Sequence, residues 1–304
     1  MLLKTISFFI LFLSITFLQQ SLFAQGCSDA GFCTIGNFNA IHEEAGKQTI
    51  AKHEMDISFI YGTHGKSEKF YQPQINYRFI KKSGAFYELR LPFNIAKNTA
   101  SGISNSGIGD ATITYNSRIK KIDYSFGFRV SFTNADESDM KTMISYPMYL
   151  QPGLGTTDLL AVANYDIAKF ISIGTGVQLP VFQYNKNVAI LTDTPPFITG
   201  TGYRRKPDAL LKFTGHYGTG KVKLSGGLLG IFHLGNDHYN YAGKKYILQD
   251  SRGTTINFNI ELGYALAKNI TFDFLFAEPL KTRKNIPDGL ARSRIIAPKL
   301  TYTF

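Results

Sequence analysis

Charged side chains set among apolar residues are the part of this sequence whose types and spacing could do chemistry. Within segments that alternate apolar and polar residues, six acids and six bases fall on the polar positions. Such residues on an interior face either line a pore and set its selectivity, or pair and fill a narrow interior. The equal numbers favour pairing, with pore lining as a by-product. The candidate lumen-lining residues are Asp56, Arg78, Glu88, Arg90, Asp110, Arg118, Arg129, Asp208, Lys212, Glu261, Asp273 and Lys299.

Arg78, Glu88 and Arg90 flank a tight turn predicted at residues 81–84. Strands joined by a tight turn are neighbours in an antiparallel sheet, and facing side chains on such strands lie about 5 Å apart. We therefore expect these three side chains to interact.

An enzymatic interpretation depends on the six histidines. Only His216 and His233 fall on inward strand positions, and the predicted hairpin places them at opposite ends. His233 could approach Asp208 across that hairpin, but no serine is obviously placed to complete a triad. No His/Cys cluster has the spacing of metal ligands, and the Gly-Thr-Gly-Lys sequence at 218–221 is typical of a tight turn rather than a phosphate loop. We expect no enzyme activity, no metal and no cofactor; a lipid hydrolase at the rim is the least favoured alternative.

The elements that must position these residues show a period of two. Apolar residues at positions 124, 126, 128, 130 and 132 alternate with Ser, Gly, Arg, Ser and Thr. Successive strand residues point to opposite faces, so each such segment has one apolar and one polar face. The length, near ten residues, suits a tilted membrane strand. About twelve segments are predicted, near 53–62, 70–80, 85–96, 109–119, 122–133, 157–166, 169–182, 207–217, 221–234, 254–266, 269–279 and 293–304.

The connections alternate between short and long. Short ones are predicted at 81–84, 120–121, 167–168, 218–220 and 268, and longer ones at 97–108, 134–156, 183–206, 235–253 and 280–292, with one brief outer loop at 63–68. Short turns on one side and long loops on the other are typical of an outer-membrane barrel. We predict an all-β fold: a transmembrane antiparallel up-and-down β-barrel of about 12 strands over residues 51–304. A water-soluble sandwich or barrel with its polar face outward is the structural alternative.

The first residues indicate an exported protein. Residues 1–24 contain Lys4, an apolar run of 13 residues at 6–18 and a small residue before the expected cleavage point. This is the pattern of a signal peptide, and the run is shorter than the ~20 residues of a spanning helix. Residues 25–50 are expected to form a short periplasmic segment. Its Cys27 and Cys33 are a candidate disulfide, with a lipid-modified Cys27 or two free thiols as alternatives.

Composition and charge bound the partners. The 304 residues are 44% hydrophobic and 18% charged, with a net charge of +11. The export signal makes a nucleic-acid partner unexpected despite this charge. Two interpretations of the basic residues are open. They either meet lipopolysaccharide outside (Arg204, Arg205, Lys244, Lys245, Arg283, Lys284) and lipid headgroups at the periplasmic turns (Lys81, Lys82, Lys120, Lys121), or simply keep loops and turns soluble. The alternating final strand ends on Phe304, which resembles the signature read by the outer-membrane assembly machinery.

Two short motifs carry a family resemblance. The sequence Gly-Ile-Gly-Asp-Ala-Thr-Ile-Thr at 107–114, and Gly-Thr-Gly-Val-Gln-Leu-Pro-Val at 174–181, resemble strands of the outer-membrane family linked to meta-pathway phenol degradation. That family is similar to the FadL-type transporters of hydrophobic compounds. The resemblance covers roughly residues 50–304 and implies a barrel that passes hydrophobic or aromatic small molecules. FadL-type barrels also have an N-terminal plug, for which residues 25–50 are short.

The sequence therefore predicts a channel in the outer membrane of a Gram-negative-type bacterium. Small molecules, apolar or aromatic in character and not identified further, would diffuse through a lumen narrowed by paired charges. The main alternative is a structural or surface-interaction barrel with no open pore.

Overall fold

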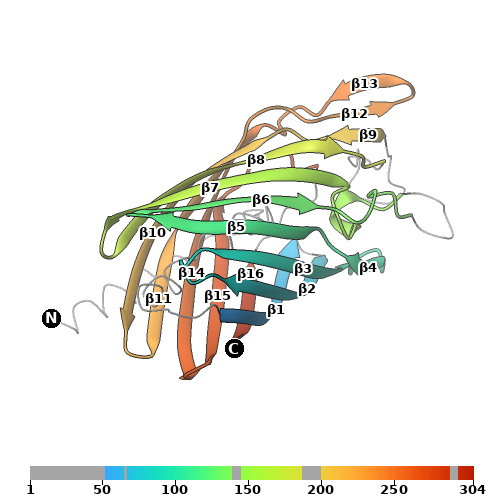
Figure 1. Ribbon diagram of the computed structural model, residues 1–304. Coiled ribbons are helices and arrows are strands. Elements are labelled where there is room, and N and C mark those ends of the chain that lie inside the picture. The colour runs from blue at the N-terminus through green and yellow to red at the C-terminus, as the bar shows by residue number, and fades with distance from the viewer. Residues whose placement is uncertain (1–51, 65–66, 139–144, 187–199, 288–293) are drawn as a thin grey trace.

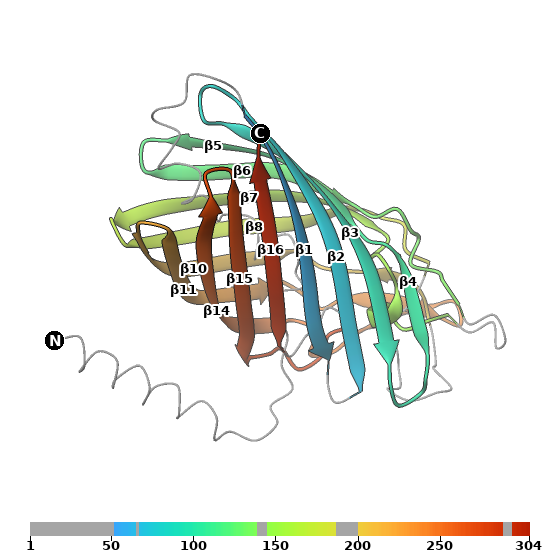
Figure 2. The ribbon, with the colours of Figure 1, turned by 90° about the horizontal axis from the view of Figure 1, so that it is seen from below.

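The computed structural model describes residues 52–64, 67–138, 145–186, 200–287 and 294–304. These residues form one closed barrel of twelve antiparallel strands (Figure 1, Figure 2), which confirms the predicted fold class. The barrel strands are β1 (Lys52–His64), β2 (Glu68–Ile80), β3 (Phe86–Asn98), β5 (Ala111–Ile119), β6 (Ile122–Val130), β7 (Thr156–Ala168), β8 (Ile171–Gln183), β10 (Asp208–Thr219), β11 (Val222–His233), β14 (Gly253–Ala267), β15 (Ile270–Lys281) and β16 (Ile295–Thr303).

The two-residue period of the sequence appears directly as alternating burial. In β3, Glu88 and Arg90 are buried, whereas Tyr87, Leu89 and Leu91 are exposed. The pleat turns successive side chains to opposite faces, so the polar set lines the interior and the apolar set covers the outside. The inner surface of the barrel is thus polar and its outer surface apolar, the reverse of a water-soluble domain.

The first and last strands close the barrel. β1 pairs with both β2 and β16, and Ile57 stands opposite Leu300 in the second pairing. His53 and Phe304 exchange two backbone hydrogen bonds of 2.9 and 2.8 Å, and their rings stack with centroids 5.6 Å apart. The chain end is therefore part of the closing seam. Recognition of Phe304 by the assembly machinery stays a prediction.

One predicted strand begins differently in the structure. β4 (Ser104–Ile108) lies in the segment predicted as a loop at 97–108, and it pairs with the far half of β3 while β5 pairs with the near half. The break falls at Gly109, where a Cβ would lie 2.6 Å from the Asn94 side chain. Any larger residue there would displace the Asn94 side chain. The break leaves Asp110 outside the regular ladder.

Five tight turns join strands at one end of the barrel, which we call the turn end. They occupy residues 81–85, 120–121, 169–170, 220–221 and 268–269. The turn predicted at 167–168 was two residues too early, because β7 continues to Ala168 before it reverses. The opposite, loop end carries the long connections.

The long connections contain structure that the sequence did not predict. β9 (Thr201–Arg204), β12 (His238–Tyr241) and β13 (Lys244–Ile247) form a separate three-stranded sheet, which we call the outer sheet (Figure 1). A single 3-10 turn, η1 (Met148–Leu150), lies in the connection between β6 and β7. A hydrophobic cluster joins this connection to the outer sheet; its buried residues are Ala135, Met148, Leu154, Tyr203, Tyr239 and Leu248.

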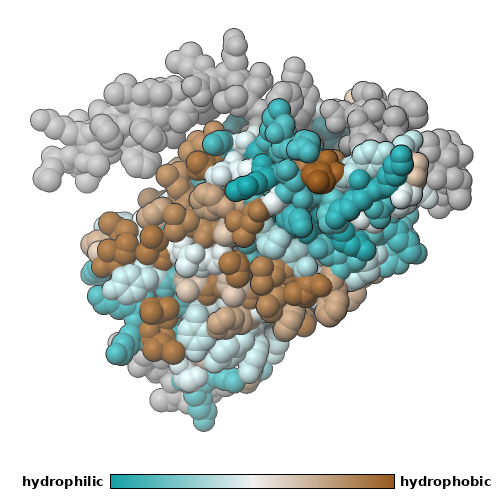
Figure 3. Space-filling model, turned by 90° about the horizontal axis from the view of Figure 1, so that it is seen from above, coloured by the Kyte–Doolittle hydropathy of each residue, from teal (hydrophilic) through white to brown (hydrophobic). Residues whose placement is uncertain are grey.

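Apolar side chains cover the outside of the barrel, and Figure 3 shows them over its body with hydrophilic side chains gathered toward the loop end. Near the turn end this cover is rich in tyrosine. Tyr87 and Tyr115 pair across β3 and β5 with ring centroids 5.3 Å apart, and Tyr115 contacts Tyr124 at 6.4 Å. We call the whole set the tyrosine girdle: Tyr77, Tyr87, Tyr115, Tyr124, Tyr165, Tyr217, Tyr264 and Tyr302.

No helix within the described part of the chain is long and apolar enough to cross a membrane. The signal peptide predicted at 1–24, the segment at 25–50 and the candidate disulfide between Cys27 and Cys33 lie outside the described residues. All three stay predictions.

Candidate functional site: the ion networks of the lumen

The structure places all twelve candidate residues on the inner side of the barrel, none of them with an exposed side chain. Eleven of them fall into three groups, and Lys212 is described with the wall network below. Their role in a pore stays a prediction. The wall network contains Asp56, Arg78, Glu88, Arg90, Glu261, Asp273 and Lys299; the mouth network contains Asp110, Arg129 and Asp208; Arg118 belongs to a third group near the turn end.

Arg78 is the centre of the wall network. Its guanidinium lies 2.6 Å from Glu88 and 3.3 Å from both Glu54 and Asp56. Glu88 also binds Arg90, at 2.5 Å. The predicted interaction of Arg78, Glu88 and Arg90 is therefore confirmed. Each charge meets at least one opposite charge, which offsets the cost of removing it from water.

The wall network continues across the seam. Lys299 on β16 lies 3.1 Å from Asp273 on β15 and 3.9 Å from Glu261 on β14. Glu261 also attracts Lys212, a buried cation on β10, which is separated from β14 only by β11. Two acids on neighbouring strands thus share one lysine at this part of the inner surface.

The third group lies beside the turn between β5 and β6. Arg118 pairs with Asp166 and lies 3.7 Å from Asp123. Its Nε also donates a 3.0 Å hydrogen bond to the carbonyl of Lys120. This guanidinium closes the inner edge of the turn and neutralises the acids found there.

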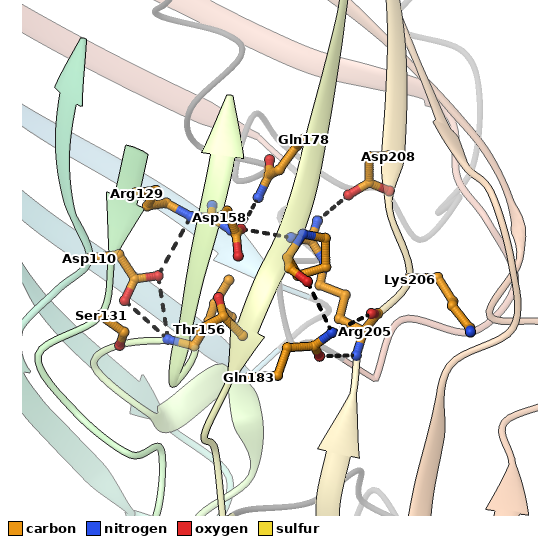
Figure 4. Close-up of polar contacts among 12 residues, drawn as sticks. Asp110, Arg129, Ser131, Thr156, Asp158, Gln178, Gln183, Arg205, Lys206 and Asp208 are labelled. Carbon is orange, nitrogen blue, oxygen red and sulfur yellow. Dashed lines mark hydrogen bonds and ion pairs between the residues drawn. The ribbon is translucent and has the colours of Figure 1, made fainter. Parts of the chain in front are cut away.

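The mouth network is centred on Asp158, which lies among β6, β7 and β8 near the loop end (Figure 4). Its carboxylate binds the guanidinium of Arg129 and the side-chain amide of Gln178. A second guanidinium, that of Arg205, lies 3.5 Å away and also pairs with Asp208. Asp158 therefore links two buried arginines that come from different parts of the chain.

Arg205 reaches this position because its backbone is held in place. The side chain of Gln183, at the end of β8, accepts the Arg205 N–H at 2.6 Å and donates to the Arg205 carbonyl at 3.0 Å (Figure 4). These two bonds fix the connection between β9 and β10 against the wall and direct its arginine inward. We predicted lipopolysaccharide contact for Arg205 and Arg283; that was wrong, since both are buried, Arg283 against the carbonyl of Ser251.

His233 connects the barrel wall to the outer sheet. Its Nδ1 lies 2.6 Å from Asp208 and its Nε2 lies 2.8 Å from Asp237. Asp237 in turn accepts the Tyr203 hydroxyl at 2.8 Å and the Lys206 N–H at 2.7 Å. Both ring nitrogens face carboxylates, so neither is directed at a serine as a triad requires. The predicted approach of His233 to Asp208 is confirmed, and this arrangement does not form a hydrolase site.

A second connection, between β6 and β7, folds against the neighbouring part of the mouth. The backbone of Leu154 donates to Asp110 at 3.1 Å, and that of Gly155 donates to the Ser131 hydroxyl at 3.0 Å. The Asn94 side chain donates to the carbonyl of Pro152. Segments 152–155 and 203–208 therefore both bind inward-facing residues, and together they narrow the loop end.

One part of the inner wall is apolar, which the sequence analysis missed. Its residues lie on β7, β10 and β11 between polar inward positions, and each is at most 6% exposed. They were overlooked because these strands are apolar on both faces, which hides the two-residue period. We call this set the aliphatic patch: Leu160, Val162, Leu210, Leu229 and Ile231.

The mouth network also includes Asp158, Arg205 and Asp237, which are not among the twelve candidates predicted from the sequence. Asp158 could have been found, because a charged residue in a strand with an apolar outer face is expected to point to the inner side. Arg205 and Asp237 lie in connections, where no periodic pattern assigns a face.

Replacing Tyr203 by phenylalanine tests how the outer sheet is attached. The variant keeps the ring in its hydrophobic cluster but removes the hydroxyl donated to Asp237. We expect a loss of about 1.5–3 kcal/mol, the usual value for a hydrogen bond to a charged group, confined to the outer sheet. Hydrogen exchange should quicken in β9 and β12 and stay unchanged in β2 and β3. Equal acceleration in all four strands would contradict a local attachment.

Comparisons with known proteins add similar structures but no family. No family model matches the chain, and no curated protein matches it. Among solved structures, the translocator domain of autotransporter NalP from Neisseria meningitidis is 8% identical, with a TM-score of 0.46, covering 91% of this chain and 97% of that one. The NanC porin is 9% identical, with a TM-score of 0.45 and coverage of 82% and 98%. The toluene transporter TodX of P. putida is 7% identical, with a TM-score of 0.41 and coverage of 86% and 92%.

Identities and scores this low leave the function to be argued from the residues of this chain. The resemblance to the meta-pathway phenol-degradation family is not confirmed and stays a prediction.

Proposed function

We propose that this protein is a channel of the bacterial outer membrane through which small apolar or aromatic molecules diffuse. The single observation that carries the proposal is a closed barrel with an apolar outer face and a polar inner face. In water this arrangement would expose a very large apolar surface, whereas in a bilayer it places that surface against lipid. Closure also leaves no strand edge facing lipid, which membrane strands require.

The outer surface supports the membrane setting in more detail. The tyrosine girdle encircles the barrel near the turn end, the position at which amphipathic rings meet lipid headgroups. Ile57, Ile75 and Leu91 stand in register across β1, β2 and β3 and are all exposed. The charges of these strand bodies point inward instead.

The inner surface favours apolar over ionic cargo. Charges of the wall and mouth networks are paired, so they present little net field to a passing ion. The aliphatic patch offers an apolar molecule a contact surface inside a polar lumen. The family resemblance at 107–114 implies cargo of the same class. Segments 152–155 and 203–208 lie against inward-facing residues at the loop end, so cargo would enter past them.

Uptake of an apolar fluorophore tests this function. Bacterial cells that express the full chain should take up N-phenylnaphthylamine several-fold faster than cells without it. Leu229→Gln, which places an amide in the aliphatic patch, should remove most of the gain. Leu234→Gln, the same change at an exposed loop-end position, should not. Folding of each variant is checked by its heat-modifiable mobility on SDS gels. Uptake that does not depend on the folded barrel would refute the proposal.

A closed structural or surface-interaction barrel is the second candidate. The observation that favours it is the loop end itself, where the mouth network and the outer sheet bind connections across the inner wall. Such a barrel would fold, insert and yet show neither ion conductance in planar bilayers nor fluorophore uptake. Its exposed loop-end residues Lys244, Lys245 and Lys284, and the partly buried Arg204, would then be the natural contacts for lipopolysaccharide phosphates.

A further inference from the structure

Every tight turn of the barrel carries lysine, and none of the five contains an acid. Most of these lysines are exposed, Lys81 being partly buried. The five turns join β2 to β3, β5 to β6, β7 to β8, β10 to β11 and β14 to β15, so the charge is distributed around the turn end. We call this set the lysine ring: Lys81, Lys82, Lys120, Lys121, Lys169, Lys221 and Lys268.

The lysine ring lies directly beside the tyrosine girdle. The amino group of Lys81 donates a 3.1 Å hydrogen bond to the Tyr87 hydroxyl and lies 4.6 Å from the centre of that ring. Lys169 lies 5.4 Å from the centre of the Phe170 ring. The cations therefore stand at the edge of the apolar surface, as amphipathic side chains do where hydrocarbon meets headgroups.

The acids nearest to the ring do not neutralise it. Asp123 and Asp166 point to the inner side, where Arg118 pairs with them. The outward rim of the turn end is left with a positive charge close to the apolar surface.

We propose that the lysine ring binds the phosphates of anionic phospholipids in the leaflet at the turn end. This inference rests on the proposed function, because it needs the barrel to span a bilayer. A cation at a membrane surface attracts anionic headgroups, and one lysine contact should raise association about fivefold. A complete ring of such contacts would give the barrel an annulus of anionic lipid, and it would oppose passage of the turns across the bilayer.

The test measures lipid selectivity of the full chain in bilayers. Spin-labelled phosphatidylglycerol and phosphatidylcholine with matched acyl chains report, by electron spin resonance, how strongly each associates with the barrel. We expect a several-fold preference for phosphatidylglycerol that weakens as salt is added. Replacing all seven lysines of the ring by glutamine should bring the ratio close to one, and Lys120→Gln with Lys121→Gln should give an intermediate value.

The matched control is Lys244→Gln with Lys245→Gln, an exposed adjacent pair on the outer sheet. It removes the same charge but should leave the ratio unchanged, because that sheet lies away from the apolar surface. Equal association of the two lipids with the unaltered chain, or an equal loss in the control, would overturn the inference. A barrel that inserts and takes up the fluorophore without lipid preference would refute this inference alone, whereas a barrel that never inserts refutes both.

Discussion

Replacing Asp158 by alanine is expected to destabilise the barrel by about 3–5 kcal/mol, the largest effect of any single substitution considered for this chain. Asp158 is 0% exposed and binds Arg129, Gln178 and Arg205. Without its carboxylate, Arg129 keeps only the more distant Asp110, at 3.9 Å, and Arg205 keeps Asp208. The penalty comes from a buried guanidinium left short of opposite charge. Urea unfolding of the refolded barrel in lipid vesicles measures it.

The control for this prediction is Asp136→Ala. Asp136 pairs with Lys186 at 3.2 Å, but the side chains are 38% and 69% exposed, so water replaces the lost contact. We expect a loss below about 1 kcal/mol. The double variant Arg129→Met with Asp158→Leu should recover part of the loss, since a buried ion pair replaced by apolar residues of similar volume is often tolerated. If Asp158→Ala and Asp136→Ala cost the same, the mouth network is not a buried ion network.

The second large effect concerns the outer surface. Ile75→Arg is expected to lower the free energy of unfolding in bilayers by about 2–4 kcal/mol. Ile75 is 52% exposed and faces outward between Ile57 and Leu91, in the middle of the apolar cover. In the proposed setting this position meets hydrocarbon, which solvates a guanidinium poorly. The same urea titration in vesicles measures the loss.

Ile247→Arg is the matched control for that substitution. Ile247 is 56% exposed, similar to Ile75, but it lies on the outer sheet rather than on the barrel wall. An arginine there remains in water, and we expect a change within about 0.5 kcal/mol. Equal tolerance of arginine at both positions would place Ile75 in water and remove the membrane setting on which transport depends.

The two predictions address opposite faces of one wall. Inside, charges are tolerated because each meets a partner; outside, an uncompensated charge is costly because lipid provides none. The same inward positions therefore stabilise the barrel and define its lumen. In the proposed channel, apolar cargo would bind at the aliphatic patch, where the wall carries no charge.

The sequence by itself determined the fold class, the approximate course of the twelve strands and the inward face of the twelve charged candidate residues. The physical reason is local: the pleat alternates side chains along any strand, so a period of two can be read from neighbouring residues alone. That is why Asp56, Arg129 and Lys299 were correctly placed on the inner side. Where both faces of a strand are apolar, as at Leu160 and Leu210, the period is hidden and the sequence did not predict which residues face inward.

Only the tertiary structure decided which charges meet and what narrows the mouth. The partner of a charge depends on strand register and on closure of the barrel, both set by contacts between residues far apart in the chain. Arg205, Asp237 and the outer sheet depend further on connections without a period, whose positions follow from hydrogen bonds such as those of Gln183. Periodicity predicts which face of the strand a residue occupies. The residues that it contacts on other strands depend on the register and closure of the whole barrel.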